Sequence, residues 1–232
     1  ATVVVPGANG RPLSLRAAGT IQVVSGANGT VLRTLAGTQR NQQLGTAIAV
    51  APDQNGDGVP DVIVGEPLAK VVVTVNNRPR TLTAAGRVAL YSGADGTLLN
   101  VIAEGSYAGD RFGAAVAVGN ADTDGNPDLI VGAPWSDAKA RNGGSVYVYN
   151  GISNNLLYTR SETGYFGSAV AIDNQRRLYV GAPFGDAFEV VNGRTRKLMR
   201  AGRASVCDSN TGTSDALLTV YGTKRGDALG SS

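Results

Sequence analysis

The sequence predicts an all-β fold made of repeated units of four short antiparallel strands. Glycine accounts for 32 of the 232 residues, about twice its ordinary share, and it is dispersed between Val, Ala, Thr and Tyr. This composition favours many short strands joined by tight turns, and no segment shows a helical period. Similar segments begin at residues 44, 112 and 166, a spacing that leaves room for four strands in each period.

The first recurring element is a predicted β-hairpin. In two copies Asn-Gly or Asp-Gly lies between alternating apolar runs, which suits a turn with positive φ and is the strongest short hairpin signal. The two copies occupy residues 19–32 and 86–99, a third opens at 144–151, and a degenerate fourth is at 188–193.

The second recurring element precedes the hairpin and consists of two predicted strands around a loop. The first strand begins with Phe-Gly or Leu-Gly, and the second ends in Gly-Ala-Pro or a variant of it. The three copies run from 44–50 to 61–67, from 112–118 to 128–134, and from 166–172 to 178–183. Glu66 replaces the Ala of Gly-Ala-Pro in the first copy, where we expect an exposed side chain.

Phe-Gly, an Asp-rich loop and Gly-Ala-Pro, in this order, resemble the FG-GAP repeat of integrin α-subunit propellers and their bacterial relatives. The resemblance covers residues 1–200 approximately, and it is specific because three copies share order, spacing and flanking hairpins. It implies a β-propeller of about four four-stranded antiparallel blades, either a small closed ring or part of a larger seven-bladed one.

The resemblance also implies where each blade begins and ends within a single domain, 1–232. Residues 1–40 would be a partial blade whose residues 2–7 take the place of the Gly-Ala-Pro strand. Residues 204–232 would be a degenerate inner hairpin or a strand that closes the ring. The complete blades would be 44–105, 112–161 and 166–201.

Two acidic loops predict metal binding, because both place oxygen ligands at positions 1, 3, 5, 7 and 9. Calcium prefers six to eight oxygen ligands, and the glycine at position 6 permits the sharp turn that brings them together. The position-7 ligand would be the backbone carbonyl. The ligand sets are Asp53, Asn55, Asp57, Val59 and Asp61 in the first loop, and Asn120, Asp122, Asp124, Asn126 and Asp128 in the second. We therefore expect two Ca²⁺ sites with a structural role.

Alternative interpretations of these loops are an EF-hand and an Asx-rich turn that binds nothing. The EF-hand fails, because position 12 is Val64 or Val131 where a bidentate Glu is required. The matching positions of two loops, including Pro-Asp at the end, favour metal over a bare turn. The third repeat has only residues 173–177 at this place, two of them arginines, and we expect no metal there.

The composition argues against several other functions. The chain has no histidine, one cysteine (Cys207) and no catalytic motif, so we do not expect an enzyme. The net charge of +3 is not gathered into a dense stripe, so no nucleic-acid binding is expected. No apolar run approaches the ~20 residues of a membrane span, so no membrane insertion is expected.

The resulting hypothesis is a secreted or cell-surface protein-binding module for cell adhesion. A glycan-binding, lectin-like propeller is the first alternative, and Trp135 is a residue that could stack on a sugar or pack within the fold. A self-associating surface or matrix protein is the second alternative. The tripeptide Arg225-Gly226-Asp227 matches a sequence that some integrins recognise, but three residues arise easily by chance.

Overall fold

A computed structural model describes residues 2–6, 12–192, 194–209 and 216–231 of the chain. These residues form twenty β-strands and no α-helix, and none of them lies in a helix long and apolar enough to cross a membrane. The chain divides into two compact units, residues 1–113 and 114–232. The all-β prediction is confirmed.

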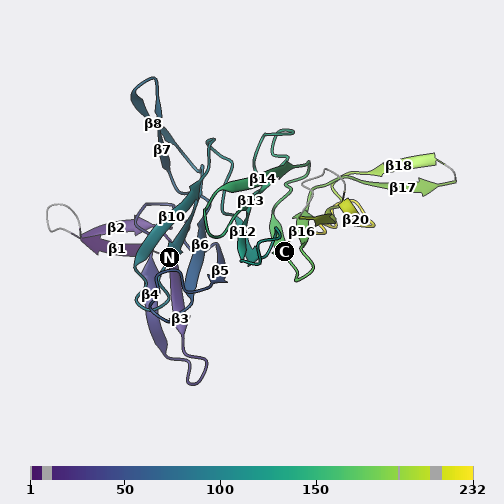
Figure 1. Cartoon of the computed structure of the whole chain (residues 1–232). Coiled ribbons are helices and arrows are strands. Elements are labelled where there is room, and N and C mark those ends of the chain that lie inside the picture. The colour runs from purple at the N-terminus through teal and green to yellow at the C-terminus, as the bar shows by residue number, and fades with distance from the viewer. Residues whose placement is uncertain (1, 7–11, 193, 210–215, 232) are drawn as a thin grey trace. The chain divides into compact units, whose positions relative to one another are not determined.

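The first unit contains ten strands (Figure 1). One four-stranded antiparallel sheet has the order β10-β9-β6-β5, and three two-stranded sheets pair β1 with β2, β3 with β4, and β7 with β8. The bounds are β1 (Thr2–Pro6), β2 (Pro12–Arg16), β3 (Thr20–Val24), β4 (Val31–Ala36), β5 (Ala47–Ala51), β6 (Asp61–Glu66), β7 (Val71–Val75), β8 (Arg78–Leu82), β9 (Arg87–Tyr91) and β10 (Leu98–Glu104).

The second unit contains two four-stranded antiparallel sheets, with the orders β11-β12-β13-β14 and β15-β16-β19-β20, and the two-stranded sheet β17-β18. The bounds are β11 (Ala115–Gly119), β12 (Asp128–Ala133), β13 (Ser145–Tyr149), β14 (Leu156–Ser161), β15 (Ala169–Ile172), β16 (Arg177–Ala182), β17 (Ala187–Val191), β18 (Arg194–Leu198), β19 (Arg203–Asp208) and β20 (Ala216–Tyr221).

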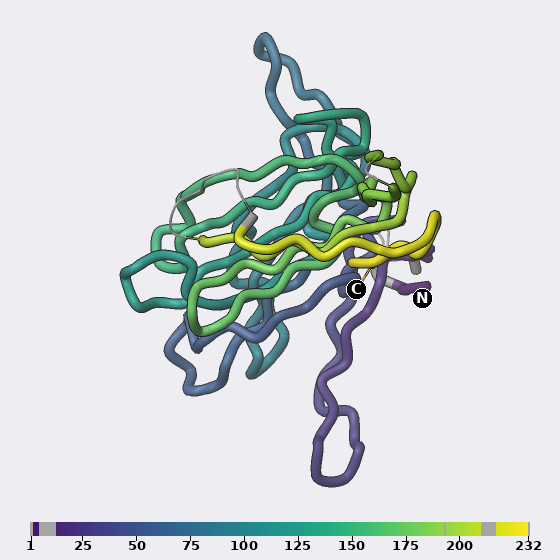
Figure 2. The backbone as a smooth tube through the Cα atoms, turned by 90° about the vertical axis from the view of Figure 1, so that its right-hand side faces the viewer, coloured from purple at the N-terminus to yellow at the C-terminus, as the bar shows by residue number. Residues whose placement is uncertain are grey.

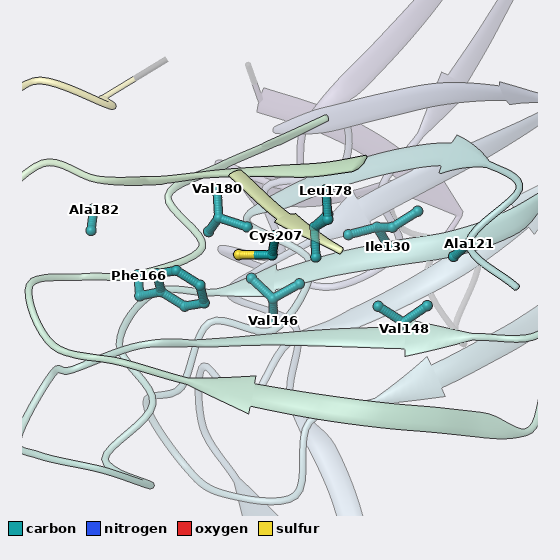
Figure 3. Packing of buried hydrophobic residues seen from close by; sticks show 9 residues of the cluster. All are labelled: Ala121, Ile130, Val146, Val148, Phe166, Leu178, Val180, Ala182 and Cys207. Atoms are coloured by element: carbon teal, nitrogen blue, oxygen red, sulfur yellow. The ribbon is translucent and has the colours of Figure 1, made fainter. Parts of the chain in front are cut away.

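The core of the second unit lies between its two four-stranded sheets (Figure 3). Strands β12 and β16 are the second strands of their sheets; β12 is buried at all six positions, whereas β16 leaves Tyr179 37% exposed. Phe166 is fully buried among them. The buried members of this cluster are Ala121, Ile130, Val146, Val148, Phe166, Leu178, Val180, Ala182 and Cys207.

A close approach of two backbones recurs in the repeats and explains why a glycine stands before the third strand of each sheet. The φ of Gly86 is +84°, and a Cβ on it would lie 2.1 Å from the carbonyl oxygen of Phe112. Gly19, Gly144 and Gly202 approach Leu44, Phe166 and Leu229 in the same way. In the fourth copy of this contact, Leu229-Gly230 takes the place at Gly202 that Phe112-Gly113 takes at Gly86.

The third complete sheet differs from the sequence-based assignment. β16 pairs with β19, and β19 pairs with β20, so residues 203–221 supply its two outer strands. The expectation that residues 188–193 form an outer strand is wrong, because β17 pairs only with β18 among the described residues. Within the described residues, β19 and β20 are therefore the third and fourth strands of this sheet and not a degenerate inner hairpin.

The N-terminal segment also differs from the expectation. β1 pairs with β2 in a hairpin of its own, so residues 2–6 do not take the Gly-Ala-Pro place beside β3. β3 and β4 match the outer hairpins of the complete sheets, with the same bulge after the fourth paired residue. The single-domain organisation of the whole chain stays a prediction.

Candidate metal centre

The second acidic loop joins β11 to β12, and the strand ladder brings its two ends together. Gly119 pairs with Asp128 at the last step of the ladder, so the eight residues between them form a closed loop. Gly125 has a φ of +83°, which only glycine adopts without strain. The expected sharp turn at position 6 is thus present in this loop.

Three carboxylates converge in this loop. Oxygen atoms of Asp122, Asp124 and Asp128 all lie within 4.8 Å of one another. Two oxygens bound to one calcium ion at 2.3–2.6 Å can be at most about 5 Å apart, so this separation suits a shared ion. The three like charges repel one another unless a cation lies between them.

Asn120 supplies an independent sign of a missing partner. Its side-chain oxygen Oδ1 is buried and has no hydrogen-bond partner among the described residues. A buried polar atom without a partner costs about 1–3 kcal/mol, and Asn120 stands at position 1 of the predicted ligand set. A cation in the loop would satisfy this oxygen.

Asp128 closes the loop and ties it to the neighbouring hairpin turn. It is 1% exposed, and its carboxylate accepts hydrogen bonds from the backbone N–H groups of Ala121 (2.7 Å), Asp122 (3.1 Å) and Gly151 (3.0 Å). Burial raises the pKa of Asp128, and the charge of Asp122 raises it further, despite the opposing hydrogen bonds. Asp128 therefore holds the loop in shape even before any ion is considered.

Asn150, in the turn between β13 and β14, is a site residue that the sequence analysis missed. Its Nδ2 donates to Oδ2 of Asp124 at 2.9 Å and to Oδ2 of Asp122 at 3.3 Å. In the first repeat Ser92 takes this place, and its hydroxyl donates to Asp57 at 3.3 Å. The recurrence of Ser or Asn before the Gly of each hairpin turn was the available signal.

The first acidic loop, between β5 and β6, is closed in the same way, but its carboxylates accept a different set of hydrogen bonds. Asp61 is fully buried and accepts from the N–H groups of Gln54 (2.8 Å) and Gly93 (3.2 Å), as Asp128 does in its loop. Asp53 accepts from the backbone of Gly56 and Gly58, both at 2.7 Å. The hydrogen bond from Gly58 lowers the pKa of Asp53.

The carboxylates of this first loop are not gathered as closely as those of the second. Among the described residues, only Asp122, Asp124 and Asp128 bring three carboxylates within 4.8 Å of one another. Asn55 donates from Nδ2 to Asp57 at 2.8 Å, and the N–H of Val59 donates to Asp57 at 2.9 Å. The ligand set of the first loop stays a prediction.

The third repeat carries a guanidinium where the other two have the acidic loops. Nε of Arg177 lies 2.7 Å from Oδ2 of Asp173, and the hydroxyl of Tyr179 donates to the same oxygen at 2.9 Å. This short turn is thus held by a side-chain cation of the chain itself. The segment 208–215, another candidate loop, lies largely outside the described residues.

Three other residues that the sequence analysis singled out make contacts within the fold. Glu66 is fully buried, contrary to the expected exposure, and accepts hydrogen bonds from Gln42, Arg87 and Tyr91. Trp135 packs edge-to-face on Tyr165 with ring centroids 5.3 Å apart, which favours packing over a sugar contact. Asp227 accepts from the backbone of Thr223 and Lys224 at 2.9 and 2.8 Å, so its carboxylate is engaged within its own turn.

Comparison with known proteins supports the repeat assignment. The FG-GAP repeat family matches residues 44–91 and 112–149. Integrin alpha-8 of Gallus gallus is 31% identical over 150 residues, 63% of this chain and 14% of that protein. Integrin alpha-IIb of Homo sapiens is 36% identical over 134 residues, 54% of this chain and 12% of that protein. The chain therefore spans about one seventh of the length of these relatives.

A solved structure supports the fold. The structure described as "Structure of Dos1 propeller" matches 97% of this chain and 48% of its own chain, with a TM-score of 0.53 and 12% identity. At this identity the likeness concerns the fold alone. With three antiparallel four-stranded sheets and the repeated Phe-Gly and Gly-Ala-Pro elements, the chain is an integrin-α-like β-propeller built from FG-GAP repeats.

Proposed function

We propose that this chain is an extracellular protein-binding module of the cell-adhesion type, in which Ca²⁺ braces the blades. The integrin-α-like repeats support an adhesion or protein-binding role. The observation that carries the calcium proposal is the second loop, where three carboxylates converge and which also contains the buried, unpartnered Asn120 oxygen. Cell-surface or secreted localisation follows from the same likeness.

The proposed ligands are the ten residues of the two loops. In the second loop they are Asn120, Asp122, Asp124, the carbonyl of Asn126 and Asp128, and in the first loop Asp53, Asn55, Asp57, the carbonyl of Val59 and Asp61. Ca²⁺ in these loops would neutralise the carboxylates and join the inner hairpin to the turn that holds Asn150 or Ser92. Its role is structural, and no catalytic residue is proposed.

Calcium binding is tested by thermal unfolding of the chain with EDTA and with 1 mM Ca²⁺. For a dissociation constant of ~0.1 mM, one site adds about 1.4 kcal/mol, which corresponds to a rise in Tm of about 3–5 °C. The variant Asp122→Asn with Asp124→Asn should lose this rise for the second site. An equal rise in wild type and variant would contradict the assignment.

The binding role is tested separately, on an array of extracellular-matrix and cell-surface protein domains and on a glycan array. Binding to one or more of the protein domains, weakened by EDTA, is expected. Binding to glycans with no binding to any protein domain would replace the adhesion proposal by the lectin-like one. A calcium-independent monomer in light scattering would be consistent with a binding module and would argue against self-assembly.

A further inference from the structure

Three two-stranded hairpins are inserted at one place in the repeat, before its third strand. They are β1–β2, β7–β8 and β17–β18, and the latter two leave the sheet between its second and third strands. In an antiparallel sheet of order 1-2-3-4, this connection lies at the end opposite to the turn between strands 1 and 2, which holds the acidic loops. In both views β7–β8 extends away from the sheet of β5, β6, β9 and β10 (Figures 1 and 2).

The three hairpins are copies of one element. Each ends in a related sequence, at residues 11–19, 78–86 and 194–202, with Arg first, a Leu at the fifth position and Ala-Gly at the end. At the base of each hairpin a buried residue pairs with this Leu: Val3 with Leu15, Val71 with Leu82, and Ala187 with Leu198. Their recurrence in three of four repeats argues for a shared role beyond linking strands.

Two of the hairpins each carry a pair of arginines, and the two arginines of a pair lie on the same face of their hairpin. Arg78 and Arg80 lie on β8, and Arg194 and Arg196 lie on β18. The two pairs stand four and two residues before the Leu that recurs in each hairpin. Each pair is two residues apart in a strand, so the side chains share a face with about 6.6–6.8 Å between Cα atoms. All four side chains are exposed.

Positive charge exceeds negative charge on these hairpins. Residues 67–86 contain Lys70, Arg78 and Arg80 and no Asp or Glu. In residues 184–202 the acids Asp186 and Glu189 form ion pairs with Lys197 at 2.6 Å and Arg196 at 3.5 Å, and Arg194 and Arg200 exceed them. Arg78 and Arg80 on β8 and Arg194 on β18 therefore have no ion-pair partner among the described residues, whereas Arg196 shares its charge with Glu189.

Apolar side chains accompany these charges. Val72 is 64% exposed on β7, and Phe188 and Val190 are 61% and 73% exposed on β17. Among the described residues each of these strands pairs on one side only, so backbone donors and acceptors are open along an edge. Open edges of this kind accept an added strand from another polypeptide.

We propose that the hairpins β7–β8 and β17–β18 are two separate binding sites, each of which binds an extended acidic polypeptide segment. A peptide in a β conformation places every second side chain on one face, about 6.6–6.8 Å apart, which is the spacing of the arginine pairs. Alternating carboxylates would meet the guanidinium groups, and the intervening side chains would cover the exposed Val and Phe. This inference rests on the proposed protein-binding function and names the class of partner.

The test uses a fluorescent probe peptide, (Glu-Val)₄, and fluorescence polarisation at about 0.15 M salt with calcium present. Saturable binding is expected. Arg78→Glu with Arg80→Glu, and separately Arg194→Glu with Arg196→Glu, should each halve the amount of peptide bound at saturation, and all four changes together should weaken binding about tenfold. The matched control is Arg33→Glu with Arg141→Glu, an equal charge change on an outer strand and in the second repeat, which has no inserted hairpin. It should change the affinity less than twofold.

Two further probes separate strand recognition from charge alone. (Glu-Pro)₄ carries the same charge but lacks every second N–H donor, which weakens its pairing as a strand, and it should bind about tenfold more weakly. Absence of binding by (Glu-Val)₄, equal loss in the control variant, equal affinity of (Glu-Pro)₄, or tighter binding of a sulfated polysaccharide at the same arginines would each overturn the proposal. If the peptide does not bind but Ca²⁺ still raises the Tm, the peptide proposal is overturned and the calcium proposal stands.

Discussion

Glu66 offers the sharpest test of how the repeats are packed, because one carboxylate satisfies three buried donors. It accepts from Nε2 of Gln42, from Nε of Arg87 and from the hydroxyl of Tyr91, the last at 3.0 Å. Gln42 and Glu66 are fully buried, and the Arg87 side chain is 13% exposed. Glu66→Ala would leave a nearly buried guanidinium without its counter-charge.

Glu66→Ala should lower the free energy of unfolding by about 3–5 kcal/mol, as is usual when one partner of a buried ion pair is removed. For a chain of this size that corresponds to a fall in Tm of about 10 °C. Urea unfolding followed by far-UV circular dichroism, which reports on the strands of both units, measures the change in unfolding free energy. A cost below about 1 kcal/mol would refute the assignment of this cluster.

The second repeat supplies the control. There Ala133 pairs with Ser145 at the position where Glu66 pairs with Arg87. Glu66→Ala with Arg87→Ser copies that pair and removes the stranded cation, so the double variant should be more stable than Glu66→Ala alone. A double variant less stable than the single one would show that Arg87 is not held chiefly by Glu66.

Three further predictions concern the second unit. Desolvation raises the pKa of Asp173, but the hydrogen bonds from Arg177 and Tyr179 outweigh it and lower that pKa to about 2; the stability from this lowered pKa is present above the unfolded value of 3.8 and is lost as pH falls toward 2. Arg177→Gln should therefore move the Asp173 midpoint upward in an NMR titration, and an unchanged midpoint would exclude the pairing. Burial raises the pKa of the Cys207 thiol, so folded protein should react with iodoacetamide far more slowly than unfolded protein, and equal rates would contradict its burial. Phe166→Ala should cost about 3–5 kcal/mol in urea unfolding, since the ring is fully buried; a loss under 1 kcal/mol would place the ring outside the core.

Much of the repeat could be predicted from the sequence, because its strands are short and are separated by strong turn signals. Two of the three complete sheets lie within the expected bounds, 44–105 and 112–161. Gly58 and Gly125 adopt the positive φ that the position-6 turn requires. These features depend on local backbone chemistry, which a single sequence displays directly.

The inserted hairpins could not be recognised from strand patterns alone. Residues 188–193 read as an outer strand, since Phe188, Val190 and Val191 are apolar, yet these side chains are 61%, 73% and 47% exposed. Only pairing partners distinguish an inserted strand from a sheet strand, and pairing is a long-range property. The Ala-Gly that follows each hairpin, at residues 18–19, 85–86 and 201–202, was the local signal of the true register.

The sequence predicts the acidic residues of the candidate site, which stay a prediction as ligands, but it does not predict the residues that support them. The loops follow from the spacing of their acidic residues, whereas Asn150 and Ser92 reach them from turns about 30 residues away in sequence. The exposure expected for Glu66 was wrong because its partners Gln42 and Tyr91 come from other elements. No local pattern reveals the contacts of Glu66, whereas the recurring Ser or Asn before the hairpin Gly marks Ser92 and Asn150.

The most direct test of the central claim is a crystal structure of the chain grown with calcium. The account predicts an ion in the second loop with the oxygens of Asp122, Asp124, Asp128 and Asn120 at about 2.3–2.6 Å. Asn150 should remain beside Asp124 in the same structure. A well-ordered second loop that holds only water at saturating calcium would contradict the account.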